Sequence, residues 1–169
     1  KVTGIINGLD LNAFDPARDE HITERYSVNN YKEAKAACKK ALQKQLNLKN
    51  DPKAPLCVMV SRLVDQKGLD LFLRVAEEML YDGIQLVVLG TGNSYYERAL
   101  SDIAKNNSSQ MSACIYYDNK MAHMLYAAGD MFLMPSLFEP CGLSQMIAMR
   151  YGTVPIVRET GGLQDTVTP

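Results

Sequence analysis

Two cationic side chains stand five positions apart in the segment 61–68, Ser-Arg-Leu-Val-Asp-Gln-Lys-Gly. Arg62 carries a planar guanidinium fork that can bind two phosphate oxygens, and Lys67 carries a mobile point charge. The helical apolar pattern that begins at Leu69 adds partial positive charge at its amino terminus. These features suit a diphosphate group. The alternative is that Arg62 and Lys67 are ordinary surface cations on a solvated loop, because charged side chains are mostly exposed in any protein.

The segment 138–145, Phe-Glu-Pro-Cys-Gly-Leu-Ser-Gln, is the most unusual stretch of the chain. Glu139 follows an apolar run and could accept hydrogen bonds from the hydroxyls of a sugar. Gly142 allows a ligand to approach the backbone closely, and the free N–H groups of the helix that begins next can hold a phosphate or a sugar oxygen. Glu139 can equally be an acid that complements the dipole in the first turn of that helix.

Further glycine and aromatic residues occur in similar settings. The segment 160–163, Thr-Gly-Gly-Leu, begins another predicted helix. It suits phosphate oxygens, or it is a tight turn that needs glycine for steric reasons alone. Tyr117 could stack on a nucleobase or cap the core. Gly-Thr-Gly at 90–92 resembles the opening of a dinucleotide-binding fingerprint, but Tyr95 stands in place of the third glycine.

The sequence indicates neither a metal site nor a covalent nucleophile. His21 and His123 are isolated, with no Ser, Cys or carboxylate partner at a catalytic spacing, so we expect both to be structural or surface residues. The four cysteines show no C-x-x-C spacing, which favours reduced thiols. A site that neutralises a diphosphate with Arg62, Lys67 and helix termini has no need of a bound divalent metal.

The composition is typical of one compact domain with a hydrophobic core. The chain has 169 residues, of which 47% are hydrophobic and 22% are charged, and its formal net charge is -1. We therefore expect no broad electrostatic binding to nucleic acid or to an anionic membrane. The sequence contains no apolar run of the roughly 18 residues that span a bilayer, so we expect no membrane partner.

Apolar runs and amphipathic stretches alternate along the chain from residue 56 onward. These patterns predict strands at 56–60, 85–89, 113–117, 131–134 and 154–157. They predict helices at 69–81, 94–106, 121–128 and 143–151, and a further helix that opens at 161. Five strands joined by helices predict an α/β fold with a doubly wound parallel sheet of the Rossmann-like kind.

The first 55 residues have a different pattern. Residues 4–16 are loop-like, residues 31–46 form a strong helix pattern rich in Lys and Ala, and residues 47–55 are typical of a linker. We predict an N-terminal segment, helix and linker at 1–55 and a Rossmann-like domain at 56–169. We expect both ends of the chain to be cuts through a larger protein.

The polar and glycine segments follow the predicted strands and do not precede them. Residues 61–68 follow the first strand, 90–92 the second, 117–118 the third, 135–144 the fourth and 158–163 the fifth. Parallel sheets of this class bind ligands outside the carboxyl ends of their strands. The asymmetry therefore predicts one ligand site at one edge of the sheet.

In this order, the motifs resemble the C-terminal domain of bacterial glycogen synthases and plant starch synthases, which have the two-domain GT-B architecture. The match covers nearly the whole chain and includes 4–16, the phosphate loop 61–68, the sugar-binding motif 135–145, 151–153 and 158–163. The family more often has Trp where Phe14 stands. Many other GT-B transferases carry a second glutamate where this chain has Ile147. Glycogen synthases tend to lack it, so Ile147 favours that subfamily.

The resemblance implies a role for each matching residue. Arg62 and Lys67 would be catalytic residues that bind the distal phosphate and stabilise the ADP leaving group, and Glu139 would hold glucose hydroxyls. Tyr117 would stack on adenine. The remaining substrate contacts would come from Cys141, Gly142, Leu143, Ser144, Thr160 and Gly161.

The implied reaction transfers glucose from ADP-glucose to the 4-hydroxyl at the non-reducing end of an α-1,4-glucan, with retention of anomeric configuration. Preorganised cations and N–H dipoles would stabilise the charge on the departing diphosphate. ADP-glucose is the donor substrate, and neither a cofactor nor a metal is implied. The family's N-terminal domain, with a lysine–glycine–glycine loop and much of the acceptor site, would close over this one. The resemblance implies a cytoplasmic enzyme, of which this chain alone would be inactive.

Two alternatives stay open at this point. The chain can be part of another GT-B transferase that uses a UDP-sugar, or it can be a non-catalytic nucleotide-binding module with the same sheet. Preference among ADP-glucose, UDP-glucose and NAD separates these readings.

Overall fold

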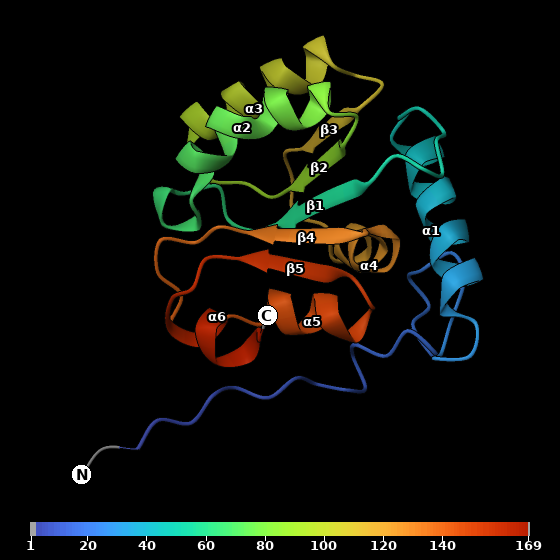
Figure 1. Ribbon diagram of the computed structural model, residues 1–169, viewed down its shortest axis with the longest axis vertical. Helices are drawn as coiled ribbons and strands as arrows, with labels where there is room; N and C mark the ends of the chain where they lie inside the picture. Colours follow the sequence, from blue (N-terminus) through green and yellow to red (C-terminus); the bar gives the residue numbers. More distant parts are fainter. Residues whose placement is uncertain (1–2, 169) are drawn as a thin grey trace.

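A five-stranded parallel sheet lies between two layers of helices in the computed structural model, which describes residues 3–168 (Figure 1). The strands are β1 (Leu56–Val60), β2 (Gln85–Leu89), β3 (Met111–Cys114), β4 (Met131–Met134) and β5 (Val154–Val157). Their spatial order is β3-β2-β1-β4-β5, and every neighbouring pair is parallel. The predicted doubly wound, Rossmann-like α/β fold is confirmed.

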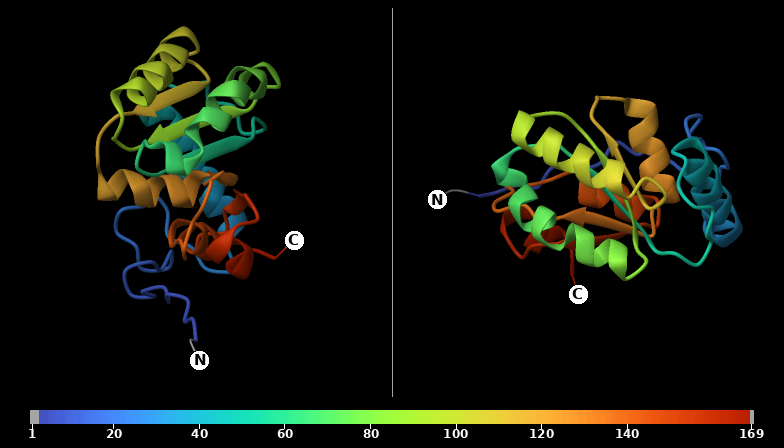
Figure 2. Two further views of the ribbon diagram at one scale, coloured as in Figure 1. Left: turned by 90° about the vertical axis from the view of Figure 1, so that its left-hand side faces the viewer. Right: turned by 90° about the horizontal axis from the view of Figure 1, so that it is seen from above.

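Helices cover both faces of the sheet because parallel strands need crossover connections. They are α1 (Tyr31–Gln45), α2 (Leu69–Tyr81), α3 (Ser94–Asn106), α4 (Asn119–Ala128), α5 (Ser144–Arg150) and α6 (Gly161–Thr166). α2 and α3 lie side by side on one face, whereas α4 and α5 cover the other and α1 packs on α4 (Figure 2). None of the helices within residues 3–168 is long and apolar enough to cross a membrane.

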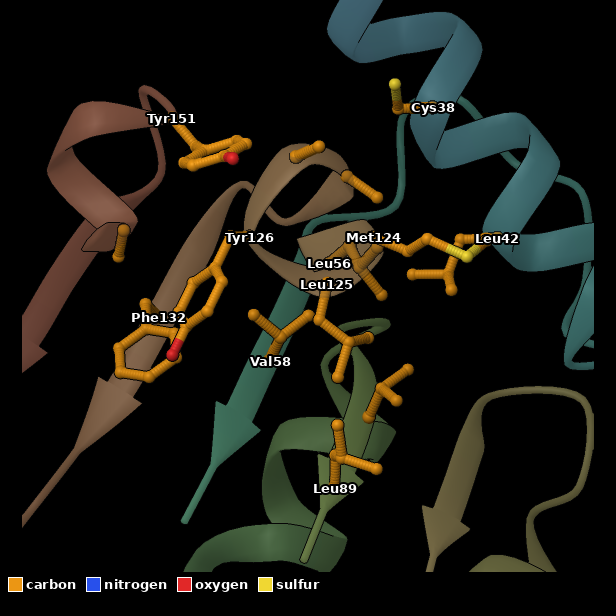
Figure 3. Packing of buried hydrophobic residues seen from close by; sticks show 14 of the residues in the cluster. Cys38, Leu42, Leu56, Val58, Leu89, Met124, Leu125, Tyr126, Phe132 and Tyr151 are labelled. Atoms are coloured by element: carbon orange, nitrogen blue, oxygen red, sulfur yellow. The ribbon is translucent and has the colours of Figure 1, made fainter. Parts of the chain in front are cut away.

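Side chains of the central strands alternate between two buried clusters, as the twofold period of a strand requires. In β1, Leu56 and Val58 point to the side of α1 and α4, where they meet Leu125 and Phe132 (Figure 3). Cys57 points to the opposite face of the sheet and packs under α2 and α3. The continuous apolar run of β1 therefore reflects burial on both faces.

The chain changes direction at β1. The first crossovers build outward to β2 and β3, and the chain then returns to add β4 and β5 on the other side of β1. The loops that leave β1 and β4 therefore turn to opposite faces and open a crevice at the carboxyl edge between the two strands.

The third strand lies earlier than predicted. β3 covers Met111–Cys114, whereas the apolar pattern predicted 113–117. Its partner β2 ends at Leu89, and the Gly90 N–H donates to the carbonyl of Cys114, so residues 115–117 have no strand beside them. α4 begins at Asn119, earlier than the predicted 121, because the Asp118 carboxylate caps the Met121 N–H at 2.8 Å.

The remaining predicted elements match closely. β1, β2, β4, β5, α2 and α3 have their predicted bounds. α1 ends one residue early, α5 is one residue shorter at each end than the predicted 143–151, and α6 opens at Gly161 as expected. Helix ends are the least determined part of a periodic pattern.

Residues before the sheet share its core. Ile22, Tyr26, Cys38 and Leu42 belong to the same buried cluster as the strand residues on the α4 side. Lys35 Nζ on α1 lies 2.9–3.1 Å from four acceptors of that layer, the carbonyls of Ala127, Gly129 and Tyr151 and the hydroxyl of Thr153, which share its three hydrogens. Burial lowers the pKa of this ammonium to about 8. The division at residue 55 stays a prediction.

A buried polar cluster fastens the N-terminal segment to α4 and α5. His123 Nδ1 lies 2.7 Å from Asp19 Oδ2, and the Tyr151 hydroxyl donates to the same oxygen. The side chains of Asp19 and His123 are 2% and 6% exposed, and Phe14 stacks on the imidazole. His123 is therefore a structural residue, as expected, and its carboxylate partner lies 104 positions away, beyond the reach of any local spacing.

Asp19 makes stability depend on pH at the acidic end. Burial raises the pKa of its carboxyl, but hydrogen bonds from Tyr151, His123 and the backbone of His21 outweigh burial and hold the pKa below its usual value. A carboxyl with a lower pKa in the folded than in the unfolded state adds stability above its unfolded pKa. That stability is lost as pH falls through the folded pKa.

We expect Asp19→Asn to lower the free energy of unfolding by about 3 kcal/mol at pH 7, because His123 and Tyr151 lose their charged partner. The difference from the unchanged chain should shrink below about pH 4, where Asp19 of the unfolded chain begins to be protonated, and should vanish once pH falls below the lower pKa of the folded state. Urea unfolding between pH 3 and 7 measures both effects. The exposed Asp102→Asn is the matched control and should change stability by less than about 0.5 kcal/mol. An equal loss for both variants would contradict the role of Asp19.

Candidate functional site

The crevice between β1 and β4 contains residues from two predicted site segments. A hollow of about 200 Å³ is lined by Arg62, Lys67, Ser136 and Ser144, together with side chains at the ends of the two strands. Loop 61–68 follows β1, and the segment that begins at residue 135 follows β4. The predicted ligand edge therefore exists as a concave surface.

Lys67 and Glu139 form an ion pair in this crevice. Lys67 Nζ lies 2.5 Å from Glu139 Oε2, and the Ser136 hydroxyl donates to the same carboxylate oxygen at 3.3 Å. The two side chains are only 14% and 11% exposed. The structure thus brings together two candidate catalytic residues that lie 72 positions apart. Neither of the two is an ordinary solvated surface charge.

Hydrogen bonds hold the two loops together around this ion pair. The Leu137 N–H donates to the carbonyl of Gln66 at 2.9 Å, and the Gln66 side chain donates to the carbonyl of Phe138 at 3.2 Å. A Cβ at Gly68 would lie 2.1 Å from the carbonyl oxygen of Pro135, and Gly68 has a φ of 70°. Glycine at this position lets the loops approach closely enough for Lys67 to reach Glu139.

Two glycine turns, 139–142 and 160–162, lie against each other. The Gly162 N–H donates to the carbonyl of Glu139 at 2.9 Å. A Cβ at Gly161 would lie 2.3 Å from the oxygen of Glu139, and a Cβ at Gly162 would lie 2.2 Å from the oxygen of Cys141. Both positions therefore require glycine for steric reasons, and the backbone contact brings Thr160 and Gly161 to the 139–142 turn.

Other candidate residues are less enclosed. Within residues 3–168 Arg62 is exposed and forms no ion pair. Leu143 is 43% exposed, and Cys141 Sγ accepts from the Asn7 N–H at 3.4 Å, so the N-terminal segment passes beside the motif. Tyr117 is 87% exposed and follows the outer strand β3. No contact joins Tyr117 to Lys67 or Glu139 in the described part of the chain.

Helix starts at this edge differ in their capping. α3 and α4 have side-chain caps from Asn93 and Asp118. α2, α5 and α6, whose first residues adjoin the two loops and the glycine turns, have no capping side chain among the described residues. Their first N–H groups therefore lack a side-chain acceptor, and those that also lack a backbone acceptor, unlike the N–H of Gly162, can bind an anion readily.

A larger hollow lies away from this edge. It has a volume of about 400 Å³ and lies between residues 15–17, 26–31 and 149–152. Arg150 in its lining is paired with Asp15 at 3.2 Å. The crevice at the carboxyl edge is the better candidate site, because there Arg62 has no ion-pair partner within residues 3–168.

Residues 33–169 match the family described as "Glycosyl transferases group 1". The chain belongs to this family. It is 51% identical over 166 residues, 98% of its length, to a glycogen synthase of Lachnoclostridium phytofermentans, and 50% identical over 165 residues to one of Clostridium beijerinckii. It covers 35% and 34% of these proteins, about a third of their length. The resemblance to glycogen synthases is confirmed.

Solved structures agree with these relatives. The catalytic domain of Starch Synthase IV from Arabidopsis thaliana, bound to ADP and acarbose, superposes with a TM-score of 0.92 and 39% identity over 98% of this chain and 34% of that one. A sucrose-phosphate synthase from Thermosynechococcus elongatus superposes with a TM-score of 0.65 at 23% identity, over 96% of this chain and 36% of that one. The second similarity shows the shared fold alone.

The structure adds site residues that the sequence motifs did not single out. Ser136 contacts Glu139, Gln66 bonds to the other loop, and Gln145 lies fully buried behind the glycine turns. Gln145 gave no distinct signal in the sequence, since it lies in the first turn of α5, where polar residues are common. Its contacts could not be read from spacing.

We expect Gly162→Ala to lower the free energy of unfolding by about 1–3 kcal/mol, because the new methyl group overlaps the backbone of Cys141. Urea unfolding measures the loss. Gly8→Ala is the control, since a Cβ at Gly8 meets no atom within 4 Å. Equal stability of Gly162→Ala and Gly8→Ala would show that the two glycine turns separate without cost.

Proposed function

We propose that this chain is the donor-binding domain of a retaining glucosyltransferase of the glycogen and starch synthase type. It would transfer glucose from ADP-glucose to the non-reducing end of an α-1,4-glucan. The observation that carries the proposal is the meeting of Lys67 and Glu139 in the crevice between β1 and β4, beside uncapped helix starts. The glycogen synthases at about half identity and the ADP-bound starch synthase structure support the same choice.

The charges of the crevice suit a diphosphate. Arg62 has no ion-pair partner within residues 3–168, and Lys67 has one carboxylate partner while its ammonium has three hydrogens to donate. The uncapped starts of α2, α5 and α6 add partial positive charge. A bound diphosphate would find cations and N–H donors already in position, which reduces reorganisation when the substrate binds.

Glu139 supplies the complementary chemistry for a sugar. An ionised carboxylate only accepts hydrogen bonds, and the hydroxyls of glucose are donors that it can bind. Because Glu139 contacts Lys67, a phosphate that attracts the ammonium and a hydroxyl that binds the carboxylate would act on the same ion pair. This arrangement couples recognition of the phosphate to recognition of the sugar and favours a nucleotide-sugar over either part alone.

Catalysis would consist mainly of leaving-group stabilisation. Negative charge grows on the diphosphate as the bond to the anomeric carbon breaks, and Arg62 and Lys67 would lie where that charge develops. Tyr117 would stack on adenine. The backbone and side chains of Cys141, Gly142, Leu143, Ser144, Thr160 and Gly161 would line the glucose and phosphate subsites.

The remaining parts of the proposal concern the whole enzyme. The chain covers about a third of its relatives, so an N-terminal domain would supply the acceptor site for the glucan. Residues 1–55 would join that domain to the nucleotide-sugar-binding domain at 56–169. The enzyme would be cytoplasmic and would use ADP-glucose without a cofactor or metal.

Calorimetric titration of this chain with ADP-glucose, UDP-glucose and NAD tests the donor. We expect ADP-glucose to bind more tightly than UDP-glucose and NAD not to bind. Tighter binding of UDP-glucose would instead support a GT-B transferase for UDP-sugars. Binding of NAD alone would point to a non-catalytic nucleotide module.

Turnover can be tested in a chimera in which this chain replaces the matching third of the Lachnoclostridium phytofermentans glycogen synthase. We expect the chimera to elongate a glucan and this chain alone not to do so. Lys67→Ala in the chimera should reduce turnover at least about tenfold, because a contact to the leaving group is lost. Lys105→Ala, an exposed lysine on α3, is the control. An unchanged rate for Lys67→Ala would remove Lys67 from the mechanism.

A further inference from the structure

Gln145 is a fully buried amide behind the candidate site. It lies in the first turn of α5 and is 0% exposed. Its Nε2 lies 3.1 Å from the carbonyls of Cys141 and Gly142 and 2.9 Å from the hydroxyl of Thr166 on α6, so its two hydrogens are shared among three acceptors. One side chain therefore touches both the 139–142 turn and the helix that follows the 160–162 turn.

The orientation of this amide follows from its neighbours. Gln145 contacts Cys141 and Gly142 through their carbonyl oxygens, and the Thr166 hydroxyl already donates its proton to the carbonyl of Gly162 at 2.6 Å. All three groups are acceptors toward Gln145, so the NH₂ end must face them. Gln145 Oε1 is then buried, and it has no hydrogen-bond partner among the described residues.

A buried oxygen without a partner destabilises a fold, and an apolar side chain of similar size would avoid that loss. Space-filling alone therefore does not account for glutamine at position 145. The amide contributes two N–H donors, which are shared among the carbonyls of residues 141 and 142 and the hydroxyl of Thr166.

The contacts of Gln145 reinforce a junction that is already tight. Gly161 and Gly162 abut the carbonyls of Glu139 and Cys141 with no room for a methyl group. Thr166 continues the connection, since its hydroxyl bonds to Gly162 and accepts from Gln145. The two glycine turns thus form one hydrogen-bonded unit with Gln145 at its centre.

We propose that Gln145 is a positioning residue, whose amide joins the 139–142 turn to α6 through Thr166 and so sets the sugar-facing side of the donor site. This inference rests on the proposed function, in which that turn lines the glucose subsite. Gln145 itself touches no substrate. Its loss should therefore weaken recognition of the sugar more than recognition of the nucleotide, whose phosphates keep Arg62, Lys67 and the start of α2.

The test compares the affinities of this chain for ADP-glucose and for ADP by calorimetry. We expect Gln145→Met to reduce the preference for ADP-glucose over ADP at least about fivefold, because Met has a similar length and no donors. Thr166→Val, which removes the hydroxyl and keeps the shape, should shift the preference in the same direction. Gln164→Met, an exposed position on α6, is the matched control and should leave the preference unchanged.

Rescue separates positioning from general damage. Thr166→Ser keeps the hydroxyl and should restore the preference of the unchanged chain, even if the substitution lowers the thermal unfolding temperature. If Gln145→Met does not fold, the Thr166→Val and Thr166→Ser pair decides the matter. An equal loss of affinity for both ligands, or no loss for either, would overturn the role of Gln145. Failure of the unchanged chain to bind ADP-glucose would instead refute the proposed function.

Discussion

The ion pair between Lys67 and Glu139 depends on the close approach of two loops, and the rest of the site follows from that approach. The loops leave neighbouring strands that are far apart in sequence, and they meet because the strand order places β4 beside β1. Gly68 packs against the backbone of Pro135 so closely that no side chain fits at position 68. Close packing of the two loop backbones, and not a large core of side chains, therefore holds the charges of Lys67 and Glu139 in place.

The helices that begin around the crevice differ in whether a side chain caps their first turn. Asn93 and Asp118 satisfy the first N–H groups of α3 and α4, so those ends gain local stability from their own side chains. The starts of α2, α5 and α6 have no such cap among the described residues. A helix start without a cap is less stable when no ligand is bound, and its unpaired N–H groups can bind an anionic ligand.

Buried polar groups connect the segment before the sheet to the helices behind it. Lys35 binds carbonyls at the ends of α4 and α5, and Asp19 joins His123 to Tyr151. Both networks use donors and acceptors that a purely apolar interface would leave unsatisfied. The two networks hold α4 and α5, which adjoin loops of the site, against α1 and the N-terminal segment.

The sequence alone determined the fold class, most element bounds and the family, because buried parallel strands and amphipathic helices have distinct periods and the motifs follow the strands in order. Its error in β3 arose because strand length depends on the partner β2. Only the tertiary structure decided that Lys67 contacts Glu139, that Asp19 partners His123, and that Gln145 joins two turns. These contacts link residues that are distant in the chain, and local pattern carries no information on which distant side chains meet.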